Sequence, residues 1–255
     1  MAENYYIWKE MLINYEPLTF WQEFFVKFYQ AFIENQRYLQ YAKGVGTTLM
    51  VTAIALCIGV ILGILVAVIR TANDQQRPGK KNFILGFVNG ICKAYVSIIR
   101  GTPMMVQMLI MGMVIFKSSR DFTTVGALTL GINSGAYVAE IIRGGLMSLD
   151  PGQAEAGRSL GLNYFDTMRT IVIPQAFKAI LPSLGNEFII LLKDTSLITV
   201  IGGRELVDAA KGVYNRTYEQ MFPLIGTAII YLALVMVFTW LQGKLERRLR
   251  QSDRR

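Results

Sequence analysis

The feature that most constrains this chain is the uncharged, strongly apolar stretch from Val45 to Ile69. At about 25 residues it is long enough to cross a bilayer as a helix. Two further runs without a charged side chain, Phe122–Ala139 and Pro223–Leu241, are roughly 18 and 19 residues long, close to the same requirement. Together these runs favour an all-α integral membrane protein over a soluble protein with buried core helices.

The sequence predicts five membrane-spanning segments, the second of them broken. Residues 82–117 would form a single helix of roughly 54 Å, well beyond one bilayer. The sequence RGTP interrupts it, and proline removes a helical hydrogen bond and clashes with the preceding turn. A competing interpretation divides this stretch into two spans. The candidate hinge residues are Arg100, Gly101, Thr102 and Pro103. The predicted spans are about 44–70, 82–117, 121–143, 175–200 and 222–246.

Basic residues indicate the orientation. The net charge is +8, and Lys and Arg crowd into Arg70–Lys81 and into the tail GKLERRLRQSDRR. Loops rich in these residues tend to stay in the cytoplasm, so an even number of crossings must separate the two clusters. Five spans meet this condition, and dividing the second span does not. We therefore expect the amino terminus outside and the carboxyl terminus, with tail residues 251–255, inside. The basic runs flank spans and carry no recognition motif, so no nucleic-acid partner is expected.

Residues 1–40 precede the membrane domain, which we expect to occupy residues 41–250. They are aromatic-rich with scattered charges, a pattern typical of a helix that lies along the membrane surface in contact with lipid. A soluble cap is the alternative. The start MAENYYIWKE lacks the basic residues followed at once by an apolar run that mark a signal peptide, so the first span is expected to be retained.

The chain offers little for catalysis or metal binding. It contains no histidine, which removes His-based triads, metal ligands and proton relays. Cys57 and Cys92 lie in apolar runs and are expected to be small buried hydrophobes. Gly79-Lys80 and Gly243-Lys244 lack the other residues of a phosphate-binding P-loop. We therefore expect no catalytic site, no metal and no ATP bound by this chain.

The polar stretch Asp150–Pro174 between two spans reads as an ordered pair of short helices. Asp150 is a good N-cap, Pro151 suits the first helical position, and Gln153 can reach back to the cap. The helix can run to Leu160, after which Gly161 suits a left-handed terminating position. Asn163 can cap a second short helix with Asp166 in its first turn, and Pro174 then restarts the chain toward the next span.

The first of these helices is slim, because its residues include Ala154, Ala156, Gly157 and Ser159, with one acid, Glu155. Such a helix can enter a groove on another protein. It can equally pack on its own membrane domain, and the residues alone leave both possibilities open.

The sequence EAGRSLGLNYFDTMRTIVIP resembles the EAA loop of the membrane subunits of ATP-binding-cassette (ABC) importers. The residues that match the pattern are Glu155, Ala156, Gly161, Ile171 and Pro174, and those that depart from it are Gly157 and Ile173. RGTPMMVQ (100–107), GINSGAYVAEIIRGG (131–145) and NEFIILLKDTSL (186–197) resemble the polar amino-acid uptake group of these permeases. The resemblance covers roughly residues 40–250, in order.

This resemblance implies a five-span type I importer permease with cytoplasmic coupling helices, in a bacterial cytoplasmic membrane. It implies that the EAA loop docks into a groove on a separate ATPase, which binds Mg-ATP and moves the spans. The implied partners are an ABC ATPase dimer, a second copy or a similar permease, and an extracytoplasmic amino-acid-binding protein. The residues expected to couple to the ATPase are Glu155, Ala156, Gly157, Gly161 and Pro174.

Charged residues inside the fourth predicted span point to the substrate path, because a charge there costs about 2.5–3.5 kcal/mol on insertion scales and usually marks a cavity or a partner. Glu187 and Asp194 are nearly two turns apart and share a face, whereas adjacent Lys193 and Asp194 point about 100° apart. The acidic side chains would bind the ammonium group of a substrate, and Lys193 would bind its carboxylate. The alternative is that these residues form polar pairs between helices and hold the bundle together. The candidate path residues are Asn133, Glu187, Lys193, Asp194, Thr195 and Ser196.

The third predicted span carries a matching polar stripe of Asn133, Tyr137 and Glu140. Glu140 and Arg143 can pair at i, i+3, which favours gating or structural use over substrate contact. A stand-alone ion-coupled carrier is the competing function, but its inverted repeats with matching helix breaks are not found here. A membrane enzyme or scaffold lacks the nucleophilic and metal chemistry. The sequence does not name the amino acid.

Overall fold

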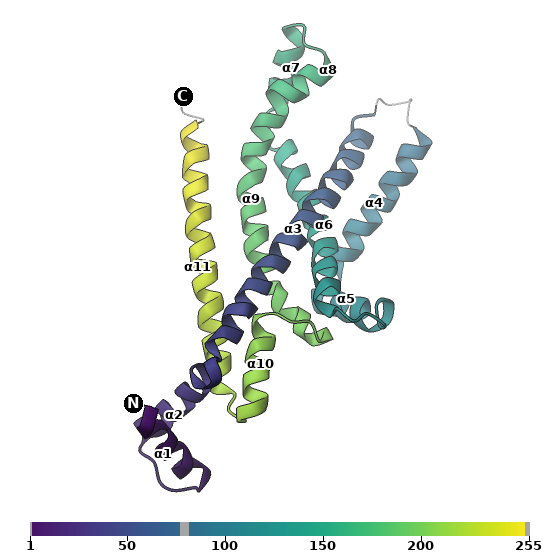
Figure 1. Ribbon diagram of the computed structural model, residues 1–255. Coiled ribbons are helices and arrows are strands. Elements are labelled where there is room, and N and C mark those ends of the chain that lie inside the picture. Colours follow the sequence, from purple (N-terminus) through teal and green to yellow (C-terminus); the bar gives the residue numbers. More distant parts are fainter. Residues whose placement is uncertain (1, 77–81, 253–255) are drawn as a thin grey trace.

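The computed structural model describes residues 2–76 and 82–252, and every regular element in them is helical. Shorter 3₁₀ and π turns join several helices (Figure 1). The α-helices are α1 Ala2–Ile13, α2 Phe20–Phe32, α3 Tyr38–Asp74, α4 Phe83–Gly101, α5 Met104–Leu109, α6 Phe122–Met147, α7 Pro151–Ser159, α8 Tyr164–Thr167, α9 Ile173–Asp194, α10 Leu206–Thr217 and α11 Met221–Ser252.

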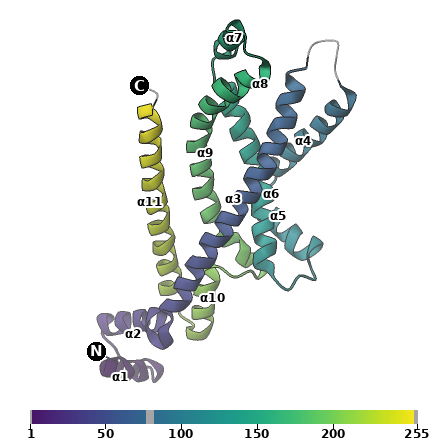
Figure 2. The ribbon, with the colours of Figure 1, turned by 45° about the horizontal axis from the view of Figure 1, so that its top comes forward.

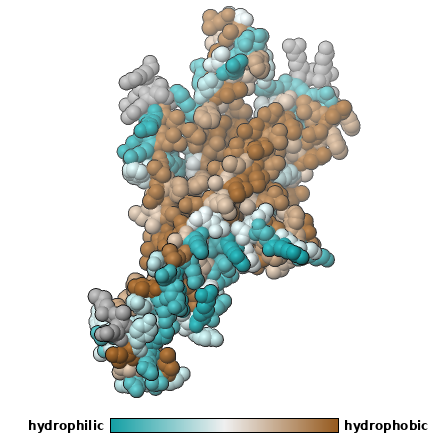
Figure 3. All heavy atoms as spheres, viewed as in Figure 1, coloured by the Kyte–Doolittle hydropathy of each residue, from teal (hydrophilic) through white to brown (hydrophobic). Residues whose placement is uncertain are grey.

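Among the described residues, four helices are long and apolar enough to cross a membrane: α3, α4, α6 and α11. The chain is thus an all-helical membrane protein with four apolar spans. A broad hydrophobic band covers these helices, and hydrophilic residues gather toward the ends (Figure 3). Helix α9, predicted as a span, is not among the four; it carries Lys178, Glu187, Lys193 and Asp194. It nevertheless runs beside α6, α3 and α11 (Figures 1 and 2).

Helices α3 and α6 pack closely through glycines. A Cβ at Gly59 would lie 2.7 Å from Ser134 Oγ, and one at Gly63 would lie 2.5 Å from Val138 Cγ1. Small residues four apart let two helix backbones approach in a membrane, where dispersion replaces the hydrophobic effect as the main attraction. Gly59 and Gly63 of α3 thus place the polar residues of α6 against the centre of the helix bundle.

The predicted break in the second span is confirmed. Helix α4 ends at Gly101, Thr102 is extended, and Pro103 is the N-cap of α5. The Gln107 amide donates to the Ile99 carbonyl at 2.7 Å and to Thr102 Oγ1 at 2.8 Å. Because a helix end leaves carbonyls without intrahelical partners, Gln107 stabilises the break from within the same segment.

Helix α10 lies in a segment expected only to connect two spans. Leu206, Ala210 and Val213 of α10 are fully buried and pack with Tyr41 of α3. Gly44 makes room for them, since a Cβ there would lie 2.8 Å from Leu206 Cα. Helix α10 therefore fixes the amino-terminal end of α3.

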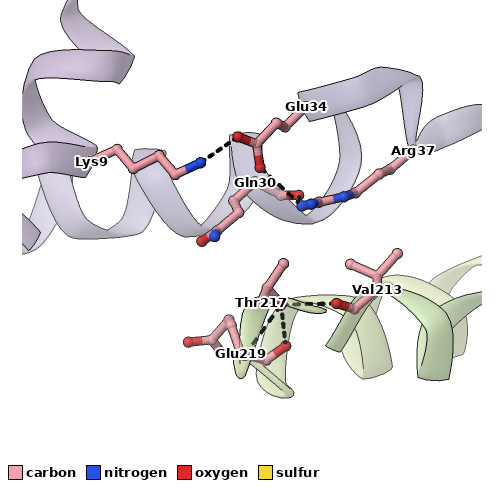
Figure 4. A network of polar contacts seen from close by, with 7 residues as sticks. All are labelled: Lys9, Gln30, Glu34, Arg37, Val213, Thr217 and Glu219. Atoms are coloured by element: carbon pink, nitrogen blue, oxygen red, sulfur yellow. Dashed lines mark hydrogen bonds and ion pairs between the residues drawn. The ribbon is translucent and has the colours of Figure 1, made fainter. Parts of the chain in front are cut away.

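The described residues before α3 form two helices, α1 and α2, rather than one surface helix. Lys9 of α1 pairs with Glu34, and Glu34 also contacts Arg37 at 3.2 Å (Figure 4). Lys27 reaches Glu219, before α11, at 3.2 Å. The Lys9 ammonium offsets the effect of burial on Glu34, so that the pKa of this carboxyl is lowered. These ion pairs hold the amino-terminal helices against the same end of the molecule as α10.

The expected burial of the cysteines is confirmed for Cys92 and wrong for Cys57. Cys57 lies on the outward face of α3, which no other part of the described chain covers. A residue in an apolar run can face lipid as readily as a protein core, so apolar neighbours alone do not predict burial. Within residues 2–76 and 82–252, no group of three or more Cys, Asp or Glu side chains could hold a metal ion.

Candidate functional site

The polar hairpin 150–174 lies at the end of the molecule opposite α1 and α2 (Figure 1). Its first helix, α7, begins and ends as predicted. The Asp150 carboxylate accepts from Gly152 N at 2.8 Å, and Gly161 has φ +83°. Leu162 N donates to Gly157 O at 3.1 Å, which closes the helix end as in a Schellman motif. Gln153 does not cap the helix; its side-chain oxygen accepts from Gln175 Nε2 at 3.2 Å.

The second part of the hairpin differs from the prediction. Asn163 caps α8 through Asp166 N at 2.9 Å, as expected. However, α8 continues through a π turn, Met168–Val172, directly into α9. Pro174 sits in the first turn of α9, where its missing N–H is tolerated, so it does not restart the chain after a break. The hairpin is therefore joined rigidly to α9.

The hairpin packs on its own chain with one face and leaves the other open. Gly157 is buried, and a Cβ there would lie 2.9 Å from both Thr167 Cγ2 and Ile171 Cδ1. Glu155 and Ala156 are exposed. The large exposed apolar side chains of this hairpin are Leu160, Tyr164, Phe165 and Ile173. Exposed apolar residues beside an exposed acid make this face suitable for contact with another protein.

Two of the predicted path residues, Glu187 of α9 and Asn133 of α6, lie at the centre of the bundle, where each makes a polar contact that involves α6. The Glu187 carboxylate is buried and accepts from Ser134 Oγ at 2.8 Å. The neighbouring Asn133 donates to Gln107 Oε1 at 2.9 Å. Asn133 and Ser134 therefore join α9 on one side to the broken helix α4–α5 on the other. Ser134 and Gln107 were not predicted as site residues, because their partners here, Glu187 and Asn133, are distant in the chain.

The remaining path residues lie at the end of α9, where it becomes a 3₁₀ turn, Thr195–Ile201. Lys193 is exposed, whereas Asp194 and Ser196 are half-buried, as expected for neighbours that point in different directions. Thr195 is fully buried; its hydroxyl donates to Leu192 O at 2.8 Å and lies 3.3 Å from the Tyr231 hydroxyl. Thr195 therefore belongs to the packing of this turn.

Sequence reasoning missed a buried acid, Glu205, which caps α10. Its carboxylate accepts from the Tyr231 hydroxyl at 2.6 Å and from Val207 N at 2.6 Å, and Thr48 Oγ1 lies at 3.4 Å. Burial raises the pKa of the Glu205 carboxyl, and these donors offset part of the effect. Through Tyr231, which also contacts Thr195, Glu205 joins α3, α10 and α11 to the end of α9.

A second polar cluster surrounds Glu140 on α6. The predicted pair with Arg143 is present at 3.1 Å. Arg70 of α3 also pairs with this carboxylate, and Arg100 Nη1 of α4 lies 3.7 Å from it. One acid thus faces three guanidinium groups from three membrane helices.

Comparisons with known proteins identify the family. The model of the binding-protein-dependent transport system inner membrane component matches residues 81–251. The arginine transport system permease protein ArtQ of Bacillus subtilis (strain 168) is 36% identical over 216 residues, covering 83% of this chain and 93% of that protein. The glutamine transport system permease protein GlnP of Escherichia coli (strain K12) is 32% identical, covering 82% and 92%.

Solved structures agree with this assignment. A crystal structure of an amino acid ABC transporter with histidines superposes with a TM-score of 0.74 at 38% identity, covering 83% of this chain and 94% of that one. The inward-facing MetNI methionine ABC transporter shares the fold, with a TM-score of 0.71 at 17% identity, covering 85% and 99%. The chain therefore belongs to the binding-protein-dependent transport system inner membrane component family, the multi-pass permease component of ABC transporters.

Proposed function

We propose that this chain is the permease subunit of an ATP-driven importer of polar amino acids, with substrates of the glutamine and arginine class. The relatives named for arginine and glutamine transport, and the amino acid transporter of the same fold, support this substrate class. The observation that carries the proposal is the buried pair of Glu187 and Ser134, which places an acid among polar residues at the centre of a membrane bundle.

The same proposal includes a fifth crossing by α9. Its 22 residues are long enough to span the hydrocarbon, and its charged residues are tolerated where they face the bundle interior or an aqueous path. With this crossing the hairpin 150–174 and the end of α11 lie on the cytoplasmic side, and α1, α2 and α10 on the outer side. Residues 41–250 then form the permease domain. Tail residues 253–255 and loop residues 77–81 lie outside the described residues.

In this arrangement Glu187 and Asp194 meet the ammonium group of an amino acid, and Lys193 meets its carboxylate. Asn133 and Ser196 complete the polar lining, and buried Thr195 holds the end of α9 from behind it. Arg100, Gly101, Thr102 and Pro103 act as the hinge of the path, since α4 ends at Gly101 and the extended backbone of Thr102 and Pro103 separates it from α5.

The hairpin couples this path to a separate ATPase dimer that binds Mg-ATP. The exposed face with Glu155 and Ala156 docks on the ATPase, while Gly157, Gly161 and Pro174 shape the hairpin behind it. The continuous helix from α8 into α9 transmits movement of the dock to Glu187. The complete importer includes a second copy of this chain or a similar permease, an extracytoplasmic amino-acid-binding protein, and surrounding lipid in contact with residues 1–40.

The test is uptake by the whole importer, reconstituted in liposomes with ATPase and binding protein. Glu187→Gln should lower ATP-dependent uptake of labelled glutamine and arginine at least tenfold while the complex stays assembled. Glu246→Gln, a change of the same kind on α11, should have no effect. Unchanged uptake by Glu187→Gln would contradict the path. Loss of the assembled complex would assign Glu187 to helix packing, and uptake without ATP would point to an ion-coupled carrier.

A further inference from the structure

The cluster around Glu140 holds more positive than negative charge. Arg143 Nη2 lies 3.1 Å and Arg100 Nη1 3.7 Å from the same Glu140 oxygen, and Arg70 pairs with the other oxygen. Among the described residues, none of these three arginines has another acidic partner within 4.0 Å. One acid does not balance three cations, so the cluster can take a further anion.

Several donors of the cluster are unused. The Nε atoms of Arg70 and Arg143 are buried without a hydrogen-bond partner. Arg100 contacts Glu140 beyond hydrogen-bond distance, and its side chain is 43% exposed. Of the three arginines, Arg100 is thus the most loosely held and the most accessible. A guanidinium presents paired N–H groups that match a carboxylate, so Arg100 can exchange its contact with Glu140 for a stronger bidentate one.

Arg100 also adjoins the polar stripe of α6. Its guanidinium lies 5.3 Å from the ring centre of Tyr137, which is on the same helix face as Asn133 and Glu140. Asn133 is bonded to Gln107, which in turn holds the break that follows Arg100. Glu140 is seven residues beyond Asn133 along α6, or ~10 Å toward the hairpin end. The cluster around Glu140 is therefore the next group of polar side chains after Asn133 toward the hairpin.

The exposed side of α4 continues this polar surface. Lys93 and Ser97 are exposed and precede Arg100 by seven and three residues, so the three side chains form one stripe. A stripe with two cations is poorly suited to face lipid hydrocarbon. It indicates that this side of α4 borders an aqueous path.

We infer that Arg100 binds the α-carboxylate of the transported amino acid on the cytoplasmic half of the path, with Arg143 completing the cationic site. This inference rests on the proposed function and adds a carboxylate-selective residue to it. Glu187 receives the ammonium group, and Arg100 then takes the carboxylate as the substrate moves inward. The same cluster chemistry would suit a lipid phosphate, which the experiment separates from the amino acid.

The test is equilibrium binding of labelled L-arginine, with argininamide as competitor, to the permease–ATPase complex in phosphatidylcholine nanodiscs. Argininamide keeps the ammonium and side chain and lacks the carboxylate. The wild type should prefer arginine at least tenfold. Arg100→Gln should weaken arginine binding at least tenfold and leave argininamide unchanged, so the preference disappears. Arg100→Lys should fall between the two, and exposed Arg120→Gln should behave as the wild type.

An unchanged preference for arginine in Arg100→Gln would overturn the inference while leaving the transport function intact. Native mass spectrometry of complexes incubated with phosphatidylglycerol tests whether the cluster binds a lipid phosphate instead. If Arg100→Gln loses bound phosphatidylglycerol with no change in arginine affinity, the cluster holds a lipid phosphate and the inference is wrong. Failure of wild-type complexes to bind arginine and glutamine at all would overturn the inference and the proposed function together.

Discussion

Gly161 is the residue at which a single change should separate ATP hydrolysis from transport. Its φ of +83° is a left-handed conformation that costs an L-residue about 1–2 kcal/mol, although there is open space for a Cβ. Gly161→Val should distort the end of α7 and lower amino-acid uptake, with insertion and ATPase activity of the complex retained. Uptake and hydrolysis measured on the same liposomes check this.

A matched control for Gly161→Val is Gly243→Val. Gly243 lies in α11, also with open space around a Cβ, and without a positive φ. It should cause no loss of uptake. Equal effects of the two substitutions would mean that the left-handed position at Gly161 has no part in coupling.

The helix caps and the left-handed turn of the hairpin could be predicted from single residues, whereas contacts between side chains distant in the sequence could not. Asp150, Gly161 and Asn163 act on backbone groups within a few positions, so their chemistry predicts their conformation. Ser134 and Gln107 look ordinary in the sequence. They matter because Ser134 meets Glu187, 53 residues away, and Gln107 meets Asn133.

The contact between α3 and α6 depends on glycines, which predicts a sharp difference between two positions on one helix. Gly63→Val would force a side chain against Val138 and should destabilise the bundle by about 1–3 kcal/mol, the usual effect of overpacking. Gly46→Val has nothing within 4 Å and should be tolerated. Thermal unfolding in detergent measures both. Equal melting temperatures for the two variants would contradict close packing at Gly63.

Helices could be predicted from the sequence where a long apolar run marks a span or where a proline ends a helix. The runs within α3, α6 and α11 and the break at Pro103 match the structure. Helix α10 was missed because its 12 residues mix polar and apolar side chains, and its burial depends on contacts with α3 and α11. The continuity of α8 with α9 is not predictable from Pro174, because a proline can follow a break or, as here, stand in the first turn of a helix.

For the whole molecule, the proposed five crossings place the hairpin and α10 on opposite sides of the membrane. In a chain with Cys57 and Cys92 replaced by alanine, Glu155→Cys should react with an impermeant maleimide only in inside-out vesicles. Tyr218→Cys, at a residue that is 92% exposed after α10, should react only in right-side-out vesicles. Labelling of both positions from the same side would show that α9 does not cross.

Residues 150–174 give the assembly its proposed link to an energy source, and the first measurement should address that link. The tagged chain is purified from native membranes in mild detergent, and the proteins that accompany it are identified by mass spectrometry. The comparison is a Glu155→Lys, Gly161→Trp double variant, which changes only the hairpin. An ABC ATPase should accompany the wild type and be absent from the variant. Recovery of the chain alone in both forms, without ATPase activity, would contradict docking of an ATPase on this hairpin.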